Sequence, residues 1–194
     1  MLIVVNDPTH VERELLAGRF ACPHCEGALR PWGHARRRVV RMATHDEEHR
    51  PRRARCANCH MTSVLLTDVC LCRRVDEVAV IGRALLEKAA GAGHRTIATR
   101  LARPPETVRG WLRRFSARME VIQEHFRRWA FVLDARLETV TPQGSPGADA
   151  LEVIGLATRA ASLLFGPRPV WSWVSAMTGG ALLANTNSPF RSPH

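Results

Sequence analysis

The chain has 194 residues and a formal net charge of +10, from 28 lysine and arginine residues against 18 acidic ones. Its composition, 45% hydrophobic and 24% charged, is ordinary for globular proteins, which excludes wholesale disorder, collagen and repeat arrays. The length suits one or two compact domains. The excess of positive charge favours an acidic partner such as a nucleic acid.

The amino-terminal residues do not resemble an export signal. The apolar run from Met1 to Val5 is too short for the hydrophobic region of a signal peptide, and acidic residues follow it. The uncharged stretch over residues 169–190 is interrupted by glycine, asparagine and proline, so it falls short of a membrane-spanning run. We therefore expect a cytoplasmic, nucleoid-associated protein with no membrane partner, whose six cysteines are reduced.

The first elements are a short strand and a helix, which we treat as a lead-in unit of residues 1–19. Leu2 to Val5 is a short apolar run typical of a buried strand. Asp7 and Pro8 supply an N-cap and a first-turn proline for a helix that continues to Leu16 and ends at Gly18.

Residues 20–72 have the pattern of a small β-rich unit. Short β-type segments are expected over residues 28–32, 37–42, 53–56 and 62–66, and residues 44–49 are expected to form a hairpin loop. Two Cys-x-x-Cys pairs, formed by Cys22 with Cys25 and by Cys56 with Cys59, are separated by 30 residues. Four thiolates in two such knuckles are typical of one structural Zn²⁺ in a zinc ribbon.

Other metal and redox readings of the cysteines are weaker. A thioredoxin-like redox site needs a single Cys-x-x-Cys between a strand and a helix, whereas this chain has two copies. Cys70 and Cys72, with His60 nearby, lack the further pair that a second metal site would need. We interpret them as small buried thiols.

Helical periodicity begins at Asp76 and predicts a helix-turn-helix over residues 76–116. Its helices are expected over residues 78–89, 94–102 and from Pro105 onward, with breaks at residues 91–93 and 103–105. Ile97, Leu101, Val108 and Trp111 would join the last two helices. A pair of helices alone is weak evidence for DNA binding, because many helical hairpins have this pattern.

The charge around the third helix strengthens the prediction of DNA binding. Residues 95–128 contain nine arginines against three glutamates. A solvated charged face is the alternative interpretation. The residues we expect to contact DNA are Arg95, Arg103, Glu106, Thr107, Arg109, Arg113 and Arg114. Because a recognition helix places its amino-terminal residues at base edges, Thr107 and Arg109 are expected to read bases, and Arg113 and Arg114 to bind phosphates.

Residues 117–187 are expected to form a helical carboxyl-terminal region, followed by a disordered tail over residues 188–194. A heptad-like stripe runs from Phe115 to Leu133, with a linker over residues 141–149, a helix over 151–164 and a short helix over 169–177. The stripe is predicted to pack on the 151–164 helix of the same chain. A homodimer seam is the alternative, so the sequence leaves monomer and homodimer open.

The order of these motifs resembles the zinc-ribbon and helix-turn-helix amino-terminal part of insertion-sequence transposases, especially small stand-alone proteins found beside transposase genes in actinobacteria. The resemblance covers residues 20–116, and its segments are Cys22–Cys25, residues 29–33, residues 53–59, residues 64–68, Ile97–Ala98 and residues 107–114. It implies that the four knuckle cysteines bind zinc and that the helix from Glu106 to Arg114 meets transposon-end or target DNA. The segment after Phe115, about 80 residues, is too short for the ribonuclease-H-like catalytic domain of such transposases, so strand transfer is not expected.

The sequence therefore predicts an α+β protein: a small β-rich zinc ribbon, then an all-α helix-turn-helix and a helical carboxyl-terminal part. We expect a non-catalytic, sequence-specific double-stranded DNA-binding protein of a transposable element, with one structural Zn²⁺. A separate transposase or transposition subunit is a further candidate partner. A transcriptional repressor and a protein-interaction adaptor remain as alternatives.

Overall fold

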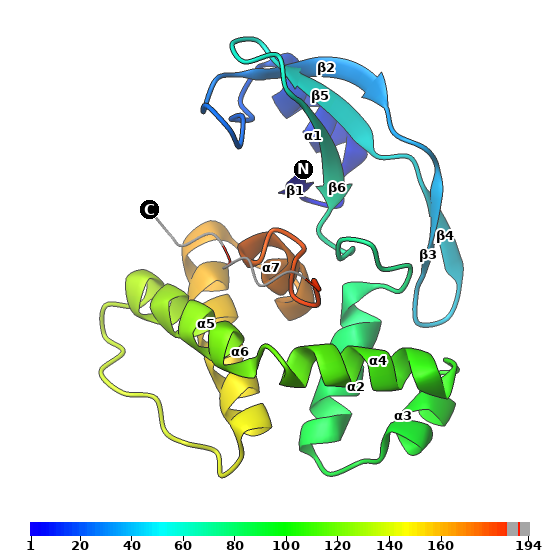
Figure 1. Ribbon diagram of the computed structural model, residues 1–194. Coiled ribbons are helices and arrows are strands. Elements are labelled where there is room, and N and C mark those ends of the chain that lie inside the picture. Colours follow the sequence, from blue (N-terminus) through cyan, green and yellow to red (C-terminus); the bar gives the residue numbers. More distant parts are fainter. Residues whose placement is uncertain (186–189, 191–194) are drawn as a thin grey trace.

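The computed structural model describes residues 1–185 and Phe190 and is α+β, as the sequence predicts. A small sheet with one helix lies on one side, and six helices pack together on the other (Figure 1). The sheet and the helices have separate main clusters of buried side chains. The two parts of the molecule are therefore stabilised by different cores.

The main sheet has four strands in the order β1-β6-β5-β2. They are β1 (Leu2–Val4), β2 (Leu29–His34), β5 (Arg52–Cys56) and β6 (Thr62–Thr67). β1 runs parallel to β6, and the other neighbours are antiparallel. Leu29 pairs with Cys56 across β2 and β5, which brings the two cysteine knuckles to the same end of the sheet.

The lead-in residues belong to this sheet. The helix α1 (Pro8–Leu16) begins as expected at Asp7, whose side chain accepts a hydrogen bond of 2.9 Å from the backbone N–H of His10. Val11 and Leu15 of α1 are buried in the same cluster as strand residues of β2, β5 and β6. Residues 1–19 thus pack with the β-rich unit, because β1 and α1 complete its core.

A two-stranded arm extends from the sheet toward the helices and consists of β3 (Arg38–Arg41) and β4 (Asp46–His49) (Figure 1). The expected loop over residues 44–49 is therefore mostly a strand. Arg41 pairs opposite Asp46, and Arg37 lies 2.6 Å from Glu48. The residues of β4 are charged or polar and have no hydrophobic alternation, so the sequence pattern could not reveal this strand.

Six helices share one hydrophobic core. This core includes residues from both regions that the sequence analysis expected to be distinct, 76–116 and 117–187. They are α2 (Val78–Ala89), α3 (His94–Arg100), α4 (Pro105–Ser116), α5 (Met119–Leu133), α6 (Pro146–Phe165) and α7 (Val170–Met177). Ile81, Val108, Ile122, Ile154 and Val174 are all buried in this core. Residues 76–116 and 117–187 are consequently one structural body.

Two expected boundaries differ from the structure. The stripe from Phe115 to Leu133 is interrupted, because α4 ends at Ser116 and α5 begins at Met119. The helix expected over residues 151–164 starts earlier, since the Ser145 hydroxyl accepts a capping bond of 3.2 Å from the backbone N–H of Ala148.

The expected disordered tail falls largely outside the described residues, which omit 186–189 and 191–194. Phe190 is described and is buried, with its ring centroid 4.7 Å from that of His125. Phe190 therefore packs beside α5.

The prediction that the stripe packs on α6 of the same chain is confirmed, since buried residues of α5 and α6 lie in one cluster. Phe126 is fully buried there. We expect Phe126→Ala to lower the free energy of unfolding by about 3–5 kcal/mol, because it leaves a cavity in a packed core. Urea titration measures this loss, and Val132→Ala, at an exposed position of the same helix, serves as the control. A Phe126→Ala protein of unchanged stability would contradict the packing.

Candidate functional site

The two Cys-x-x-Cys knuckles have matching local geometry. In each, the backbone N–H two residues after the first cysteine points at that cysteine's sulfur: His24 to Cys22 Sγ at 3.5 Å and Asn58 to Cys56 Sγ at 3.3 Å. The residue after each second cysteine has a left-handed backbone, with φ of 61° at Glu26 and 62° at His60. These sharp turns direct two sulfurs of each knuckle toward the same point.

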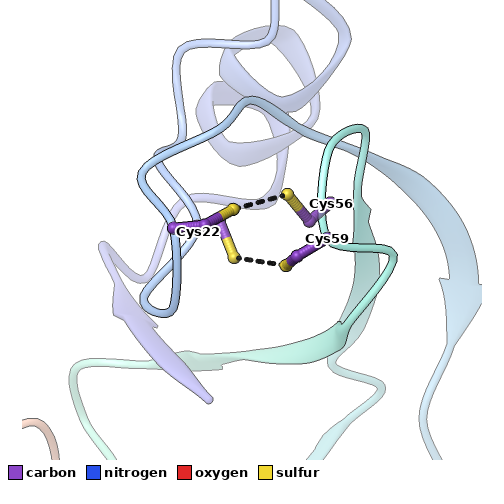
Figure 2. A group of neighbouring side chains, drawn as sticks. Cys22, Cys56 and Cys59 are labelled. Atoms are coloured by element: carbon purple, nitrogen blue, oxygen red, sulfur yellow. Dashed lines mark hydrogen bonds between the residues drawn. The ribbon is translucent and has the colours of Figure 1, made fainter.

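The four thiols face one another across a small gap, as Figure 2 shows for the two sulfur pairs. Cys22 Sγ lies 3.6 Å from Cys59 Sγ, Cys25 Sγ lies 3.4 Å from Cys56 Sγ, and all four sulfurs lie within 4.8 Å of one another. Sulfurs about 2.3 Å from a tetrahedral zinc ion would be about 3.8 Å apart. The donor set thus suits one tetrahedral metal ion.

The two knuckles lie close together at Gly27. A Cβ at this position would lie 2.6 Å from Asn58 Nδ2 of the other knuckle. A larger residue would therefore have to displace the Asn58 side chain, so the absence of a side chain at Gly27 leaves room for Asn58 between the knuckles.

The thiols of the cluster hold their protons unequally. Burial opposes ionisation of Cys56, but the backbone N–H groups of Cys59 and Asn58 lower the pKa of its thiol to about 6. The pKa of the Cys59 thiol is raised to about 12, because hydrogen bonding to Cys25 and burial outweigh the opposing effect of the Met61 N–H. Four adjacent thiolates repel one another unless a cation lies between them, so binding of a metal would displace the remaining protons.

Cys70 and Cys72 do not extend this cluster. Cys70 Sγ lies 3.6 Å from Thr67 Oγ1, and Cys72 Sγ lies 3.4 Å from the carbonyl oxygen of Gly179. Burial raises the pKa of both thiols. Among residues 1–185 and Phe190, the knuckle cysteines are the only group of three or more metal-ligating side chains close enough to share an ion.

The side chain of Arg103 is largely buried and bonds to other parts of the fold. Its side chain is 9% exposed, and its Nε lies 2.7 Å from Oδ1 of Asp76, which is 2% exposed. Its Nη2 also donates to the carbonyl oxygens of Met42 at 2.6 Å and Arg41 at 3.2 Å. The guanidinium therefore connects the turn between α3 and α4 to the β3–β4 arm, and we remove Arg103 from the expected DNA contacts.

The helix α4 presents one buried and one open face. Val108, Trp111 and Phe115 point into the helical core. Glu106 and Arg109 lie on the open face, with the Arg109 side chain 65% exposed and its Nη1 3.5 Å from Glu106 Oε2. An exposed ion pair of this kind is weak, so Arg109 can exchange it for another partner.

The remaining residues expected to contact DNA lie at different depths. Arg113 is exposed on α4, and Arg95 is exposed near the start of α3. Thr107 and Arg114 are half-buried on one flank of α4. The Nε of Arg114 donates to Asn185 Oδ1 at 2.8 Å, and its Nη1 donates to the carbonyl oxygen of Gly110 at 3.0 Å.

Two further arginines lie beside α4 that the sequence analysis did not single out. Arg73 and Arg74 belong to the connection between the β-rich unit and α2, and they line the same depression as Thr107 and Arg114. Their signal in the sequence is only a pair of adjacent arginines shortly before Asp76. Nothing in a local pattern indicates that this pair faces a helix some 30 residues later in the chain.

Comparisons with protein-family models, curated proteins and solved structures find no match to this chain. In the part of the chain that the structure describes, no helix is both long and apolar enough to cross a membrane.

Proposed function

We propose that this chain is a non-catalytic, sequence-specific double-stranded DNA-binding protein of a transposable element, which recognises the transposon end or the target site. In this proposal α3 and α4 form a helix-turn-helix, and α4 enters the major groove. The resemblance of residues 20–116 to the amino-terminal part of insertion-sequence transposases supports the assignment to a mobile element.

The observation that carries the proposal is the open face of α4. It presents Arg109 and Arg113 to solvent, while the opposite face of the helix is buried and fixed in the core. A rigid helix with exposed arginines can hydrogen-bond to guanine edges and to phosphates. The net charge of +10 would attract duplex DNA to this surface.

We assign the metal of the cysteine cluster as one structural Zn²⁺. Four thiolates in a closed tetrahedral arrangement are the donor set that structural zinc sites use. All four protein ligands are needed to complete such a site, so it would leave no open position for a substrate. The bound zinc would hold the two knuckles together and thereby stabilise the sheet from which the β3–β4 arm extends.

The proposal predicts different effects for two arginines of α4. We expect Arg109→Ala to lose about 1–3 kcal/mol of binding free energy at the preferred site, because its guanidinium would bind guanine O6 and N7 together. Arg113→Ala should weaken binding to all duplexes alike. It should also reduce the slope of the logarithm of the binding constant against the logarithm of salt concentration by about one counterion. The duplex is first selected from a random pool, and anisotropy titrations at two salt concentrations compare it with a scrambled duplex.

Arg159→Ala is the matched control for these titrations, because Arg159 is an exposed arginine on α6. This variant should bind as the wild type does. Equal losses on the selected and the scrambled duplex for Arg109→Ala would exclude a base-reading role for that residue. Failure of the selection to enrich any sequence would contradict sequence-specific binding.

A protein-interaction adaptor is the second candidate. The observation that favours it is a run of three exposed apolar residues at the end of α6, Leu163, Leu164 and Phe165. Binding to DNA with a steep salt dependence would distinguish the first proposal from this one, since an apolar interface has little dependence on salt.

A further inference from the structure

A basic pocket of about 400 Å³ lies where the connection to α2 meets α4. Arg41 at the end of β3, Arg73 and Arg74 of the connection, and Arg114 of α4 contribute its positive charges. Asp76 and Glu106 are the acidic residues that line it. The pocket is therefore built from three parts of the chain that are distant in sequence.

The two carboxylates do not balance the four guanidinium groups. Asp76 is already paired with the buried Arg103 at 2.7 Å, with Arg41 Nε further away at 3.7 Å. Glu106 is exposed and lies 3.5 Å from Arg109 on the open face of α4. The pocket consequently keeps an excess of positive charge, most of it on Arg73, Arg74 and Arg114.

Arg74 and Arg114 are held close together by uncharged oxygens. Nη2 of Arg74 donates to the carbonyl oxygen of Leu183 at 2.6 Å, and Nε of Arg114 donates to Asn185 Oδ1 at 2.8 Å. Burial and the nearby charge of Arg114 lower the pKa of Arg74. The buried Nε of Arg74 has no hydrogen-bond partner among the described residues. An anion in the pocket would relieve the repulsion between these two guanidinium groups.

We propose that this pocket binds a single backbone phosphate of the DNA duplex that α4 contacts. The inference rests on the proposed function, because the pocket adjoins the face of α4 that carries Arg109 and Arg113. Thr107, Gly110 and Arg114 of α4 form one wall of the pocket, and Arg73 and Arg74 form another. A phosphate held between these walls would fix the position of the helix along the groove, since phosphate contacts set the register that base contacts require.

Two substitutions alter the pocket without removing a side chain from either hydrophobic core. Arg73 has a left-handed backbone with φ of 58°, which glycine adopts more readily, so Arg73→Gly removes the charge while relieving strain. A Cβ at Gly110 would lie 2.9 Å from Arg114 Nη1, so Gly110→Ala displaces that guanidinium. Alanine is also preferred to glycine inside a helix. Both variants are therefore expected to remain folded, which thermal unfolding checks.

The test uses the full chain loaded with zinc and the duplex selected for the wild type. Phosphates of that duplex are replaced one at a time by neutral methylphosphonates. We expect one replacement to weaken wild-type binding about tenfold, as for loss of a charge-assisted contact. Arg73→Gly and Gly110→Ala should each bind the unmodified duplex several-fold more weakly and lose their sensitivity to that same replacement. Arg159→Ala should behave as the wild type does.

A second arm separates a duplex phosphate from free phosphate. Inorganic phosphate is titrated against the wild type and Arg73→Gly at constant ionic strength. The proposal would be overturned if inorganic phosphate bound the wild type but not Arg73→Gly, while no methylphosphonate replacement in the duplex weakened binding. The pocket would then be a site for free phosphate. Duplex binding by Arg73→Gly and Gly110→Ala with unchanged affinity and unchanged methylphosphonate sensitivity would overturn it while leaving DNA binding by α4 intact. A wild type that binds no duplex would instead overturn the proposed function and the phosphate site together.

Discussion

The protein is expected to contain one Zn²⁺ per chain, and Cys56→Ser is expected to release it and unfold the β-rich unit. Structural zinc binding at four thiolates is worth about 10–16 kcal/mol, which exceeds the stability of a small sheet. Cys56 is buried and lies at the end of β5, opposite Leu29 of β2, so loss of the metal there would free the end of the sheet. Elemental analysis counts the zinc, and hydrogen exchange over residues 20–66 reports the unfolding.

The helices α2–α7 should survive loss of the metal. Their core is separate from the cluster that contains Cys22 and Cys56, so far-UV circular dichroism should retain the helical signal after chelation. Cys70→Ser is the matched control, because this buried cysteine lies outside the four-thiol cluster. Zinc contents of zero or two per chain after gentle purification, or release of metal by Cys70→Ser, would contradict the single site.

Arg103→Ala should lower the free energy of unfolding by about 3–5 kcal/mol. The substitution leaves the Asp76 carboxylate buried without its closest partner, and unpaired buried charges are costly. It also removes the donor to the carbonyl oxygens of Arg41 and Met42, which attach the β3–β4 arm to the helices. Urea unfolding monitored by tryptophan fluorescence measures the loss.

Arg100→Ala is the control for this substitution. Arg100 lies on the neighbouring helix α3 and forms an exposed ion pair of 3.2 Å with Glu87, so its loss should cost less than about 1 kcal/mol. The double substitution of Asp76 and Arg103 by alanine should recover part of the stability, because no unpaired charge then remains. An Arg103→Ala protein as stable as Arg100→Ala would show that the buried pair is not needed for the fold.

Local sequence patterns were sufficient for most elements and for the cysteine cluster. The cap at Asp7 and the turn at Gly18 define α1, because capping depends on neighbouring residues only. The spacing within each Cys-x-x-Cys pair determines how two sulfurs point at one ion. Strand β4 was missed because its residues, Asp46–His49, have no apolar alternation, and the early start of α6 was missed because its first turn lacks apolar periodicity.

The sequence by itself determined the α+β class, the helical periodicity and the four cysteines that lie together, since each depends on residue types at short spacing. The tertiary structure decided which arginines remain available to a partner. Arg103 and Arg109 look alike in the sequence, yet one is buried against Asp76 and the other is exposed on α4. Only the folded chain brings Arg73 and Arg74 beside Arg114. Burial and long-range pairing depend on contacts between distant segments, which no local pattern records.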